Sequence, residues 1–477
     1  MVFHVYENED QPIINLPNMS FDDFSDDVLN LILSKLSPKT LSIISCTSKR
    51  FHKLCWNPQF FSTIVLDDSY AYYTPFSIAA LCGRGPDMRH LTINLHRNDL
   101  PDSIFFYLAC SCTHLTSLSI NLCTTKGKNI NEFSIDLLLN FLSSSKVIRS
   151  LTFKDSALLD DAQFERILPY ILMIQSINLS GCSISDVSLF NLSQQCSSLQ
   201  VLDISETNIS GVCLSYLFHY CSGLKIFRAN NCLEIQHNVF DTIPSNHFKS
   251  ITELSIINTP INLENSLTHF INLNTLKIGT LDDSTLIPFL MQNKSIEVLY
   301  VGKETNVTIS SLLVAIQTCG NKLKSLMFNP FFKKIIINDE IIRLICYKCK
   351  NLKTLSLSCC YKISTYWVIK LLKKLKFIED LSFYDWENAN SSTLKIISEY
   401  MKNLKFFRIS GSNHLTTKGV IEFIELNKNI HNFEIKGTSV NTGLDGSLDP
   451  VIISNLQLQN NKIIEISPGV ITYIYQN

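Results

Sequence analysis

The feature that most constrains the fold of this chain is a six-residue pattern, apolar-x-x-apolar-x-apolar, that recurs along most of its length. Clear copies are LTSLSI at Leu115–Ile120 and LKTLSL at Leu352–Leu357. The middle apolar positions, spaced 22 to 33 residues apart, are 91, 118, 151, 177, 202, 227, 254, 276, 299, 326, 355, 381, 407 and 433. A weaker copy follows at Ile453–Leu458, with Leu456 in the middle. Spacing this even over so many copies indicates one repeated structural unit.

Each copy predicts one short β-strand, and the segments between copies predict helices. Side chains alternate between the two faces of a strand, so the last two apolar residues of the pattern point to the same side. Apolar residues from Trp367 to Leu372 show the 3.6-residue spacing of a helix, and Ser185 with Asp186 suits a helix start. We therefore expect an α/β solenoid in which stacked repeats share one core, with parallel strands inside and helices outside.

A small polar residue or a cysteine stands five places after the middle position in many repeats. These residues are Cys123, Ser156, Cys182, Thr207, Cys232, Thr259, Cys360, Ser412 and Thr438. A side chain of this size can lie inside the bend that follows the strand. There it can contact backbone groups that would otherwise lack a hydrogen-bond partner.

The segment Cys349–Ser364, CKNLKTLSLSCCYKIS, resembles the cysteine-containing leucine-rich repeat that is typical of F-box adaptors. The resemblance covers about residues 88–440. It implies a leucine-rich-repeat horseshoe, an architecture whose concave sheet commonly binds ligands.

The repeat is absent from residues 20–61, which instead predict three short amphipathic helices. Ser25 with two following aspartates suits a helix start, Pro38 suits the first position of a second helix, and Ser48 precedes a third. Three helices in about 40 residues bury little apolar surface on their own. Such a module needs a partner or a neighbouring domain.

This N-terminal stretch resembles an F-box through FSDDVL at Phe24–Leu29, ILSKL at Ile32–Leu36 and TSKRF at Thr47–Phe51. It departs from the family pattern with Phe24–Ser25 in place of Leu-Pro and with Thr47 in place of Val. The resemblance implies a Skp-family adaptor as partner and, through it, the cullin and RING subunits of a ubiquitin ligase. The implied adaptor contacts are Phe24, Val28, Leu29, Ile32, Leu33, Leu36, Pro38 and Leu41. The alternative is that half of these residues pack between the three helices.

The sequence thus predicts an N-terminal tail (1–19), an F-box (20–64), a solenoid of about 14 repeats (65–440) and a possible last repeat with a C-terminal cap (441–477). Apolar residues near the end, such as Val470, Ile471, Tyr473 and Ile474, would cover the open end of the solenoid core.

Composition and charge exclude several classes of function. The net charge of -1 gives no basic face for nucleic acid, and short runs such as Lys373–Lys376 suit the solvated face or end of a helix. No apolar run approaches the roughly 18 residues of a membrane span, and the acidic N-terminus lacks the features of a signal peptide. We expect no membrane association and a cytoplasmic location, with a nuclear share left open.

No catalytic or cofactor motif is present: the sequence lacks G-x-x-x-x-G-K-[ST], H-E-x-x-H and G-x-S-x-G. Cys346 and Cys349 form a lone C-x-x-C without the second pair that a zinc site needs. Cys346 shares an apolar helix face with Ile342 and Ile345, so we predict core packing for it rather than metal binding. We expect no catalytic residue, no cofactor and no metal ligand.

Large outward-facing residues in the later repeats are the best candidates for a target-binding surface, because aromatic residues, Met and Arg dominate interface energetics. They are Tyr300, Met327, Phe331, Tyr384, Trp386, Phe406 and Arg408. Phe331 and Trp386 stand where most repeats have a small residue. For these two rings, burial in a rearranged loop is the favoured alternative.

The family resemblance implies a non-enzymatic adaptor that recognises a target protein for an SCF-type cullin-RING ubiquitin ligase, with ubiquitin transferred by other subunits. Two other hypotheses remain open. One is a scaffold or signalling protein whose helical module binds something else. The other is a leucine-rich-repeat receptor that holds a small molecule as part of its target site, which predicts a deep polar pocket at the concave face. The sequence does not identify the target.

Overall fold

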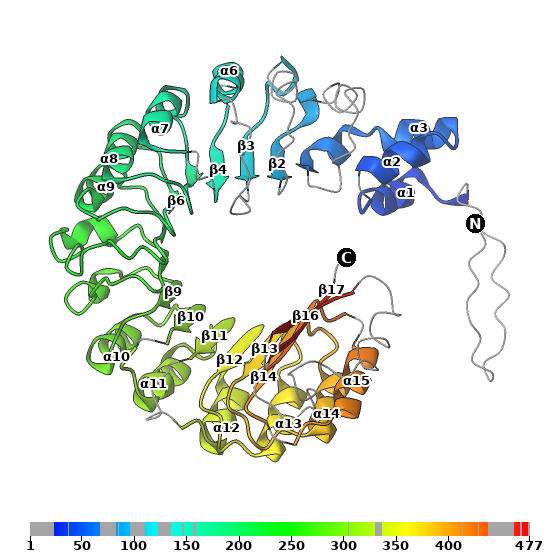
Figure 1. The fold of residues 1–477 in the computed structure, drawn as a ribbon, viewed down its shortest axis with the longest axis vertical. Coiled ribbons are helices and arrows are strands. Elements are labelled where there is room, and N and C mark those ends of the chain that lie inside the picture. The colour runs from blue at the N-terminus through cyan, green and yellow to red at the C-terminus, as the bar shows by residue number, and fades with distance from the viewer. Residues whose placement is uncertain are drawn as a thin grey trace.

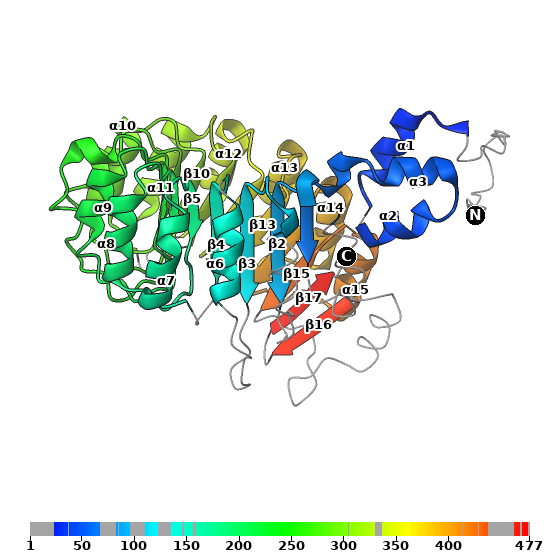
Figure 2. The same cartoon turned by 90° about the horizontal axis from the view of Figure 1, so that it is seen from above.

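The computed structural model describes residues 23–36, 38–66, 83, 85–95, 110–122, 135–145, 147–155, 159–303, 305–329, 336–412, 414–427, 429–436, 462–467 and 470–475. The chain forms a curved solenoid with a small helical head at its N-terminal end (Figure 1). Strands line the inner, concave side and helices form the outer side. Viewed from above, the helical head lies beyond the first strand of the sheet (Figure 2).

Fifteen described strands pair in parallel, each with the next along the chain, to form one curved sheet. They are β1 (Thr63–Leu66), β2 (His90–Leu95), β3 (Ser117–Leu122), β4 (Ser150–Lys154), β5 (Ser176–Asn178), β6 (Val201–Asp203), β7 (Ile226–Arg228), β8 (Glu253–Ile256), β9 (Thr275–Ile278), β10 (Val298–Val301), β11 (Ser325–Phe328), β12 (Thr354–Leu357), β13 (Asp380–Phe383), β14 (Phe406–Ser410) and β15 (Asn432–Lys436). The sheet is open and ends at β1 on one side.

The register confirms the repeat that the sequence predicts. The middle apolar residues stand directly opposite one another on neighbouring strands, from the pair Leu91 and Leu118 to the pair Phe407 and Phe433. All of the intervening middle positions pair in the same way. Each of these side chains is buried, so a row of apolar residues runs through the whole solenoid.

Sequence reasoning missed one strand, β1, which lies before the first predicted copy. Ile64 in β1 pairs with Leu91 and is buried. Phe61, Ile64 and Leu66 fit the apolar pattern, and this signal lies at the end of the predicted helical module. The head therefore runs directly into the sheet.

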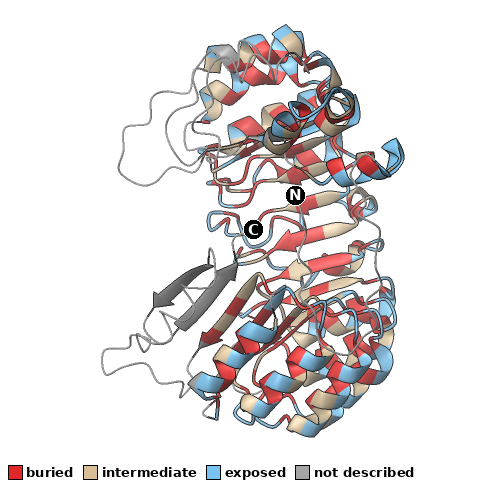
Figure 3. Ribbon diagram, turned by 90° about the vertical axis from the view of Figure 1, so that its right-hand side faces the viewer, coloured by how far each residue is buried: buried red, intermediate tan, exposed pale blue. Residues whose placement is uncertain are grey.

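Most helices of the outer side begin with polar side-chain caps, as Ser185 and Asp186 predict. Ser185 Oγ accepts a hydrogen bond from the Val187 N–H at 3.3 Å, and Asp160 Oδ1 accepts one from the Gln163 N–H at 2.9 Å. These helices are α6 (Ile135–Ser144), α7 (Asp161–Ile167), α8 (Asp186–Gln195), α9 (Leu214–Tyr220), α10 (Asp283–Gln292), α11 (Ile309–Cys319), α12 (Asp339–Lys348), α13 (Thr365–Lys374), α14 (Ser391–Tyr400) and α15 (Thr417–Leu426). Their buried sides face the sheet and their exposed sides face outward (Figure 3).

Two repeats return to the sheet through short 3-10 turns instead of α-helices: η6 (Ser245–Phe248) and η7 (Leu267–His269). Phenylalanines fill the core there. The Phe248 and Phe270 rings stack with centroids 4.4 Å apart, and Phe240 contacts both rings at 5.6 and 5.9 Å. These rings supply apolar surface that a helix supplies in the other repeats.

Small residues lie inside the bends after the strands, as predicted. The Cys182 thiol donates to the Phe153 carbonyl at 3.0 Å, the Thr259 hydroxyl to the Ala229 carbonyl at 2.5 Å, and the Cys232 thiol to the Ile204 carbonyl at 3.1 Å. Thr207, Cys360 and Ser412 also donate to backbone carbonyls. Cys123, Ser156 and Thr438 lie outside the described residues.

The described C-terminal residues form a hairpin of β16 (Lys462–Ser467) and β17 (Val470–Tyr475). β17 pairs antiparallel with β15 and so continues the sheet beyond the last repeat. Val470, Ile471, Tyr473 and Ile474 lie in β17. The predicted copy around Leu456 lies outside the described residues. No helix in the described part of the chain is both long and apolar enough to span a membrane.

Candidate functional site

The helical head consists of α1 (Asp26–Leu33), α2 (Pro38–Ser45) and α3 (Lys49–Cys55). Side-chain caps start two of these helices: Ser25 Oγ accepts from the Val28 N–H at 3.4 Å, and Ser48 Oγ accepts from the Phe51 N–H at 3.1 Å. The head has its own small core of five buried residues, Leu29, Leu33, Leu41, Leu54 and Cys55.

An arginine ties the third helix to the start of the first. Arg50 donates to Asp26 Oδ1 through Nε at 3.0 Å and Nη2 at 2.8 Å, and Nη2 also donates to the Phe24 carbonyl at 2.6 Å. Arg50 belongs to the TSKRF run that carries the F-box resemblance. Because the ion pair is partly exposed, it adds little to stability. Its main effect is to fix the position of the third helix relative to the start of the first.

The burial of the head corrects part of the predicted adaptor surface. Leu29, Leu33 and Leu41 are buried between the helices, so they cannot touch a partner unless the head opens. Phe24 and Leu36 are half-buried and pack against the same core. The side chain of Pro38, the first residue of α2, lies outside the described residues.

Val28 and Ile32 from the predicted set are exposed, with 41% and 40% of their surface accessible. Sequence reasoning missed two apolar residues that are more exposed still, Leu31 at 67% and Ile43 at 63%. Val28, Leu31 and Ile32 follow the i, i+3, i+4 spacing and so share one side of α1. The helix thus has apolar residues on two sides, one facing the core of the head and one facing solvent.

A groove of about 500 Å³ lies between α1 and the segment that leads into β1. Asp27, Asn30 and Leu31 of α1 line it together with Ser34, the C-cap of this helix, and the opposite wall includes Phe60 and Thr63. Asn30 Oδ1 is buried and has no hydrogen-bond partner in the described part of the chain. A buried acceptor without a donor is costly. The residues of this wall that are exposed to a partner are Asp27, Leu31 and Ser34.

The concave face carries two arginines that are each held between two carboxylates. Arg228 Nε donates to Glu253 at 2.7 Å, and Asp203 lies 3.9 Å from Nη1. Arg408 Nη1 donates to Asp380 at 3.1 Å, and its Nε lies 3.5 Å from Glu434. Burial raises the pKa of Asp380 even though Arg408 acts in the opposite sense.

Three predicted target-binding residues lie in one row across the strands. Tyr300 pairs with Met327, and the row continues through two serines to Arg408. The Tyr300 ring lies against Gly302, where a Cβ would come within 3.2 Å of it. Burial, with a smaller effect of the nearby Tyr384, raises the pKa of Tyr300. Tyr300, Met327, Tyr384 and Arg408 are half-buried, whereas the two serines of the row are buried.

Phe406 lies in the neighbouring row, and its ring centroid is 6.0 Å from the Arg408 guanidinium. Its ring is exposed to 36%. Arg408 therefore approaches an aromatic ring as well as two carboxylates.

Trp386 is a correction to the predicted target surface. It is fully buried, and its Nε1 donates to the Ile363 carbonyl at 3.3 Å. The Phe383 ring packs against it in a T-shape at 5.1 Å. The ring thus serves the core of the bend, as the alternative interpretation held. Phe331 lies outside the described residues.

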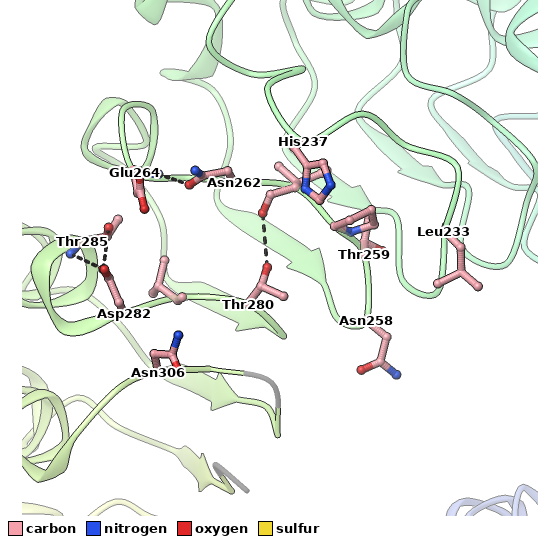
Figure 4. Close-up of a pocket in the computed structure, with 13 residues that line it drawn as sticks. Leu233, His237, Asn258, Thr259, Asn262, Glu264, Thr280, Asp282, Thr285 and Asn306 are labelled. Atoms are coloured by element: carbon pink, nitrogen blue, oxygen red, sulfur yellow. Dashed lines mark hydrogen bonds between the residues drawn. The ribbon is translucent and has the colours of Figure 1, made fainter. Parts of the chain in front are cut away.

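A polar pocket of about 560 Å³ lies where β7, β8 and β9 end (Figure 4). Several of its polar groups make local hydrogen bonds. Thr280 Oγ1 donates to the Ile261 carbonyl at 3.3 Å, and Asp282 Oδ1 accepts from the Thr285 N–H and hydroxyl at 3.1 and 3.0 Å. Burial acts to raise the pKa of Asp282, but hydrogen bonds from Ser284 and Thr285 hold it below its usual value.

The cysteine pair Cys346 and Cys349 is buried in the solenoid core, as predicted. Burial raises the pKa of the Cys346 thiol to about 11 and that of Cys349 to about 12. The described residues contain no group of three or more His, Cys, Asp or Glu side chains placed to hold a metal ion.

Comparison with known proteins identifies the head. Residues 21–63 match the F-box domain. A search of curated protein sequences finds no match.

Among solved structures, the chain is similar to one in the yeast complex of Rad7 and Elc1, with 16% identity, a TM-score of 0.48 and coverage of 83% of this chain and 90% of that chain. An internalin from Listeria monocytogenes gives 13% identity, a TM-score of 0.26 and coverage of 86% and 92%. The assignment of a leucine-rich-repeat solenoid after an F-box rests on the strand pairing and burial seen in this chain.

Proposed function

We propose that this protein is the target-recognition adaptor of an SCF-type cullin-RING ubiquitin ligase. The F-box would bind a Skp-family adaptor, and the concave sheet would hold a target protein. F-box proteins are typically non-catalytic adaptors. Ubiquitin transfer would then be carried out by other subunits, joined through the cullin and the RING protein.

The observation that carries this proposal is the joining of the two parts. The F-box match ends at residue 63, and β1 begins at Thr63 and pairs with β2 of the solenoid. No linker separates the head from the sheet. A protein bound to the head would therefore have a fixed position relative to the concave face. An adaptor that presents a target to other subunits requires such a fixed arrangement.

The solvent-facing side of α1 is the surface that we assign to the Skp-family adaptor. Val28, Leu31 and Ile32 expose apolar area on a helix whose opposite side already holds the core of the head. Clustered apolar residues that remain exposed mark interaction sites. The groove beside Asn30 adds a polar feature to the same helix.

The test is copurification of the full chain with a Skp-family adaptor. Val28→Asp together with Ile32→Asp should abolish the complex, because two charges would be buried in an apolar interface. The matched control is Val187→Asp with Val212→Asp, two valines of the solenoid that are more exposed than Val28 and Ile32, and it should leave the complex intact. Failure of the unmodified chain to bind any Skp-family adaptor would instead support the scaffold hypothesis.

A further inference from the structure

The helices α12, α13 and α14 lie side by side on the outer side of the solenoid, opposite the concave sheet (Figure 1). This part of the chain has an unusual charge distribution. Residues 341–378 contain nine basic residues, Arg343, Lys348, Lys350, Lys353, Lys362, Lys370, Lys373, Lys374 and Lys376, and no Asp or Glu. The chain as a whole has a net charge of -1, so this positive charge is local.

Three lysines of α13 lie over aromatic rings from all three helices. Lys374 Nζ is 4.8 Å from the centre of the Tyr347 ring of α12, and Lys373 Nζ is 5.0 Å from that of Tyr400 in α14. Lys370 Nζ lies 4.6 Å from the ring of Tyr366. We name these six residues, with Trp367 and Phe377, the basic-aromatic patch.

The patch is exposed, and its charges are not neutralised. Tyr347, Tyr366 and Phe377 are exposed to 56%, 59% and 63%. Within the described chain, Lys370, Lys373 and Lys374 have no carboxylate within ion-pair distance, whereas Lys353 and Lys405 nearby both pair with Glu379. Ammonium groups held in place by rings lose less freedom when a negative group binds them.

We propose that the basic-aromatic patch binds an acidic segment of a partner protein. Carboxylates would approach the three ammonium groups from outside, while the rings beneath supply apolar contact area. The patch lies on the outer, helical side of the solenoid, and the concave face lies on the inner side. An acidic partner and a target could therefore bind at the same time.

The geometry disfavours two other polyanions. Single-stranded nucleic acid binds by stacking its bases on open aromatic faces, and here ammonium groups cover faces of the rings. A lipid surface is flat, whereas α12, α13 and α14 follow the convex arc of the solenoid (Figure 1). An extended peptide can follow that arc.

Fluorescence anisotropy with the full chain tests the proposal. The probe is a fluorescein-labelled peptide of alternating Glu and Ser, compared with the same peptide carrying Gln for Glu. The chain should bind only the Glu peptide, and more weakly as salt is raised. The triple substitution Lys370→Gln, Lys373→Gln and Lys374→Gln should raise the Kd about tenfold or more.

Two variants control for fold and charge. Lys225→Gln with Lys249→Gln and Lys294→Gln removes the same charge from exposed lysines elsewhere and should leave the Kd unchanged. Replacing the three patch lysines by Arg should retain binding. The proposal is overturned if the patch and control variants bind equally. It is also overturned if phosphatidylserine vesicles or single-stranded DNA bind the patch more tightly than the peptide.

Discussion

Ser185 donates two hydrogen bonds to Asp161, one from its backbone N–H at 2.9 Å and one from its hydroxyl at 2.6 Å. Asp161 lies in the first turn of one repeat's helix, and Ser185 is the N-cap of the next helix. The same contact recurs along the solenoid between Asp186 and Ser210, between Asp283 and Thr308, and between Asp339 and Ser364. These carboxylates couple neighbouring repeats and satisfy backbone donors where the chain enters each helix.

Removal of one of these couplings should lower stability. Asp186 accepts from the N–H groups of Ser210 and Gly211 at 2.7 and 3.1 Å, so Asp186→Ala leaves donors without a partner. We expect a loss of about 1–3 kcal/mol in the free energy of unfolding, measured by urea denaturation. Glu234→Ala, at an exposed position, is the control and should change little. Equal stability of the two variants would show that these contacts do not couple the repeats.

The same carboxylates predict a dependence of stability on pH. Burial acts to raise the pKa of Asp161 and of Asp186, but hydrogen bonds from Ser185, Ser188, Ser210 and Cys213 outweigh it and lower both values. A lowered pKa in the folded state means that the stabilisation is present above the unfolded value of about 3.9 and is lost as pH falls through the folded value. The urea concentration at the unfolding midpoint should therefore decrease as the pH is lowered below about 4.

The double variant Asp161→Asn with Asp186→Asn separates these two groups from the other carboxylates of the chain. At neutral pH its urea midpoint should be lower than that of the unmodified chain. On acidification its midpoint should decrease by less. Parallel curves for the variant and the unmodified chain would contradict the assignment.

Trp386 should matter for stability and not as a contact for the target. Trp386→Ala removes a fully buried ring and leaves a cavity, which costs about 3–5 kcal/mol. Tyr384→Ala, two residues away and half-buried, should cost less than half as much. Thermal unfolding followed by circular dichroism distinguishes the two variants. A small effect of Trp386→Ala would mean that the ring is not part of the core.

The predicted row on the concave face can be tested on target capture. Tyr300→Ala with Met327→Ala removes two neighbouring half-buried side chains from the row. Proximity labelling should then lose a set of proteins that the unmodified chain labels, while binding to a Skp-family adaptor stays intact. Thr92→Ala with Ser119→Ala changes the same row on β2 and β3 and serves as the control. An unchanged set of labelled proteins would exclude Tyr300 and Met327 from the target site.

Thiol reactivity should follow burial. Cys46 and Cys110 are exposed, whereas Cys196 and Cys349 are buried, and burial with the neighbouring thiols raises the pKa of each of the latter two to about 12. At about pH 8 the buried thiols remain protonated and shielded. Iodoacetamide labelling read by peptide mass spectrometry should modify Cys46 and Cys110 in the native chain, and Cys196 and Cys349 only after unfolding. Native labelling of Cys349 would contradict its place in the core.

The strands could be predicted from sequence because the alternation of side chains and the even repeat length together fix the register. Leu326 and Leu355, for example, pair as their positions in the pattern require. The surface of the head could not be predicted as well. Apolar residues lie on two sides of α1, and spacing alone does not tell that Leu29 faces the core while Leu31 faces solvent.

The role of Trp386 also depended on information that the sequence does not carry. A large ring at a position for small residues is tolerated only if the bend supplies room and an acceptor for its N–H. Here the Ile363 carbonyl of the preceding repeat is that acceptor. The basic-aromatic patch was visible as a lysine run, but the meeting of its lysines with rings from α12 and α14 requires the stacked helices.

Hydrogen exchange of the full chain, alone and with a purified Skp-family adaptor, tests the central claim most directly. We predict slowed exchange in residues 26–45, which form α1 and α2, with the strands of the concave face unchanged. A chain that forms no complex, or one in which protection appears on the solenoid and spares α1, would contradict the account.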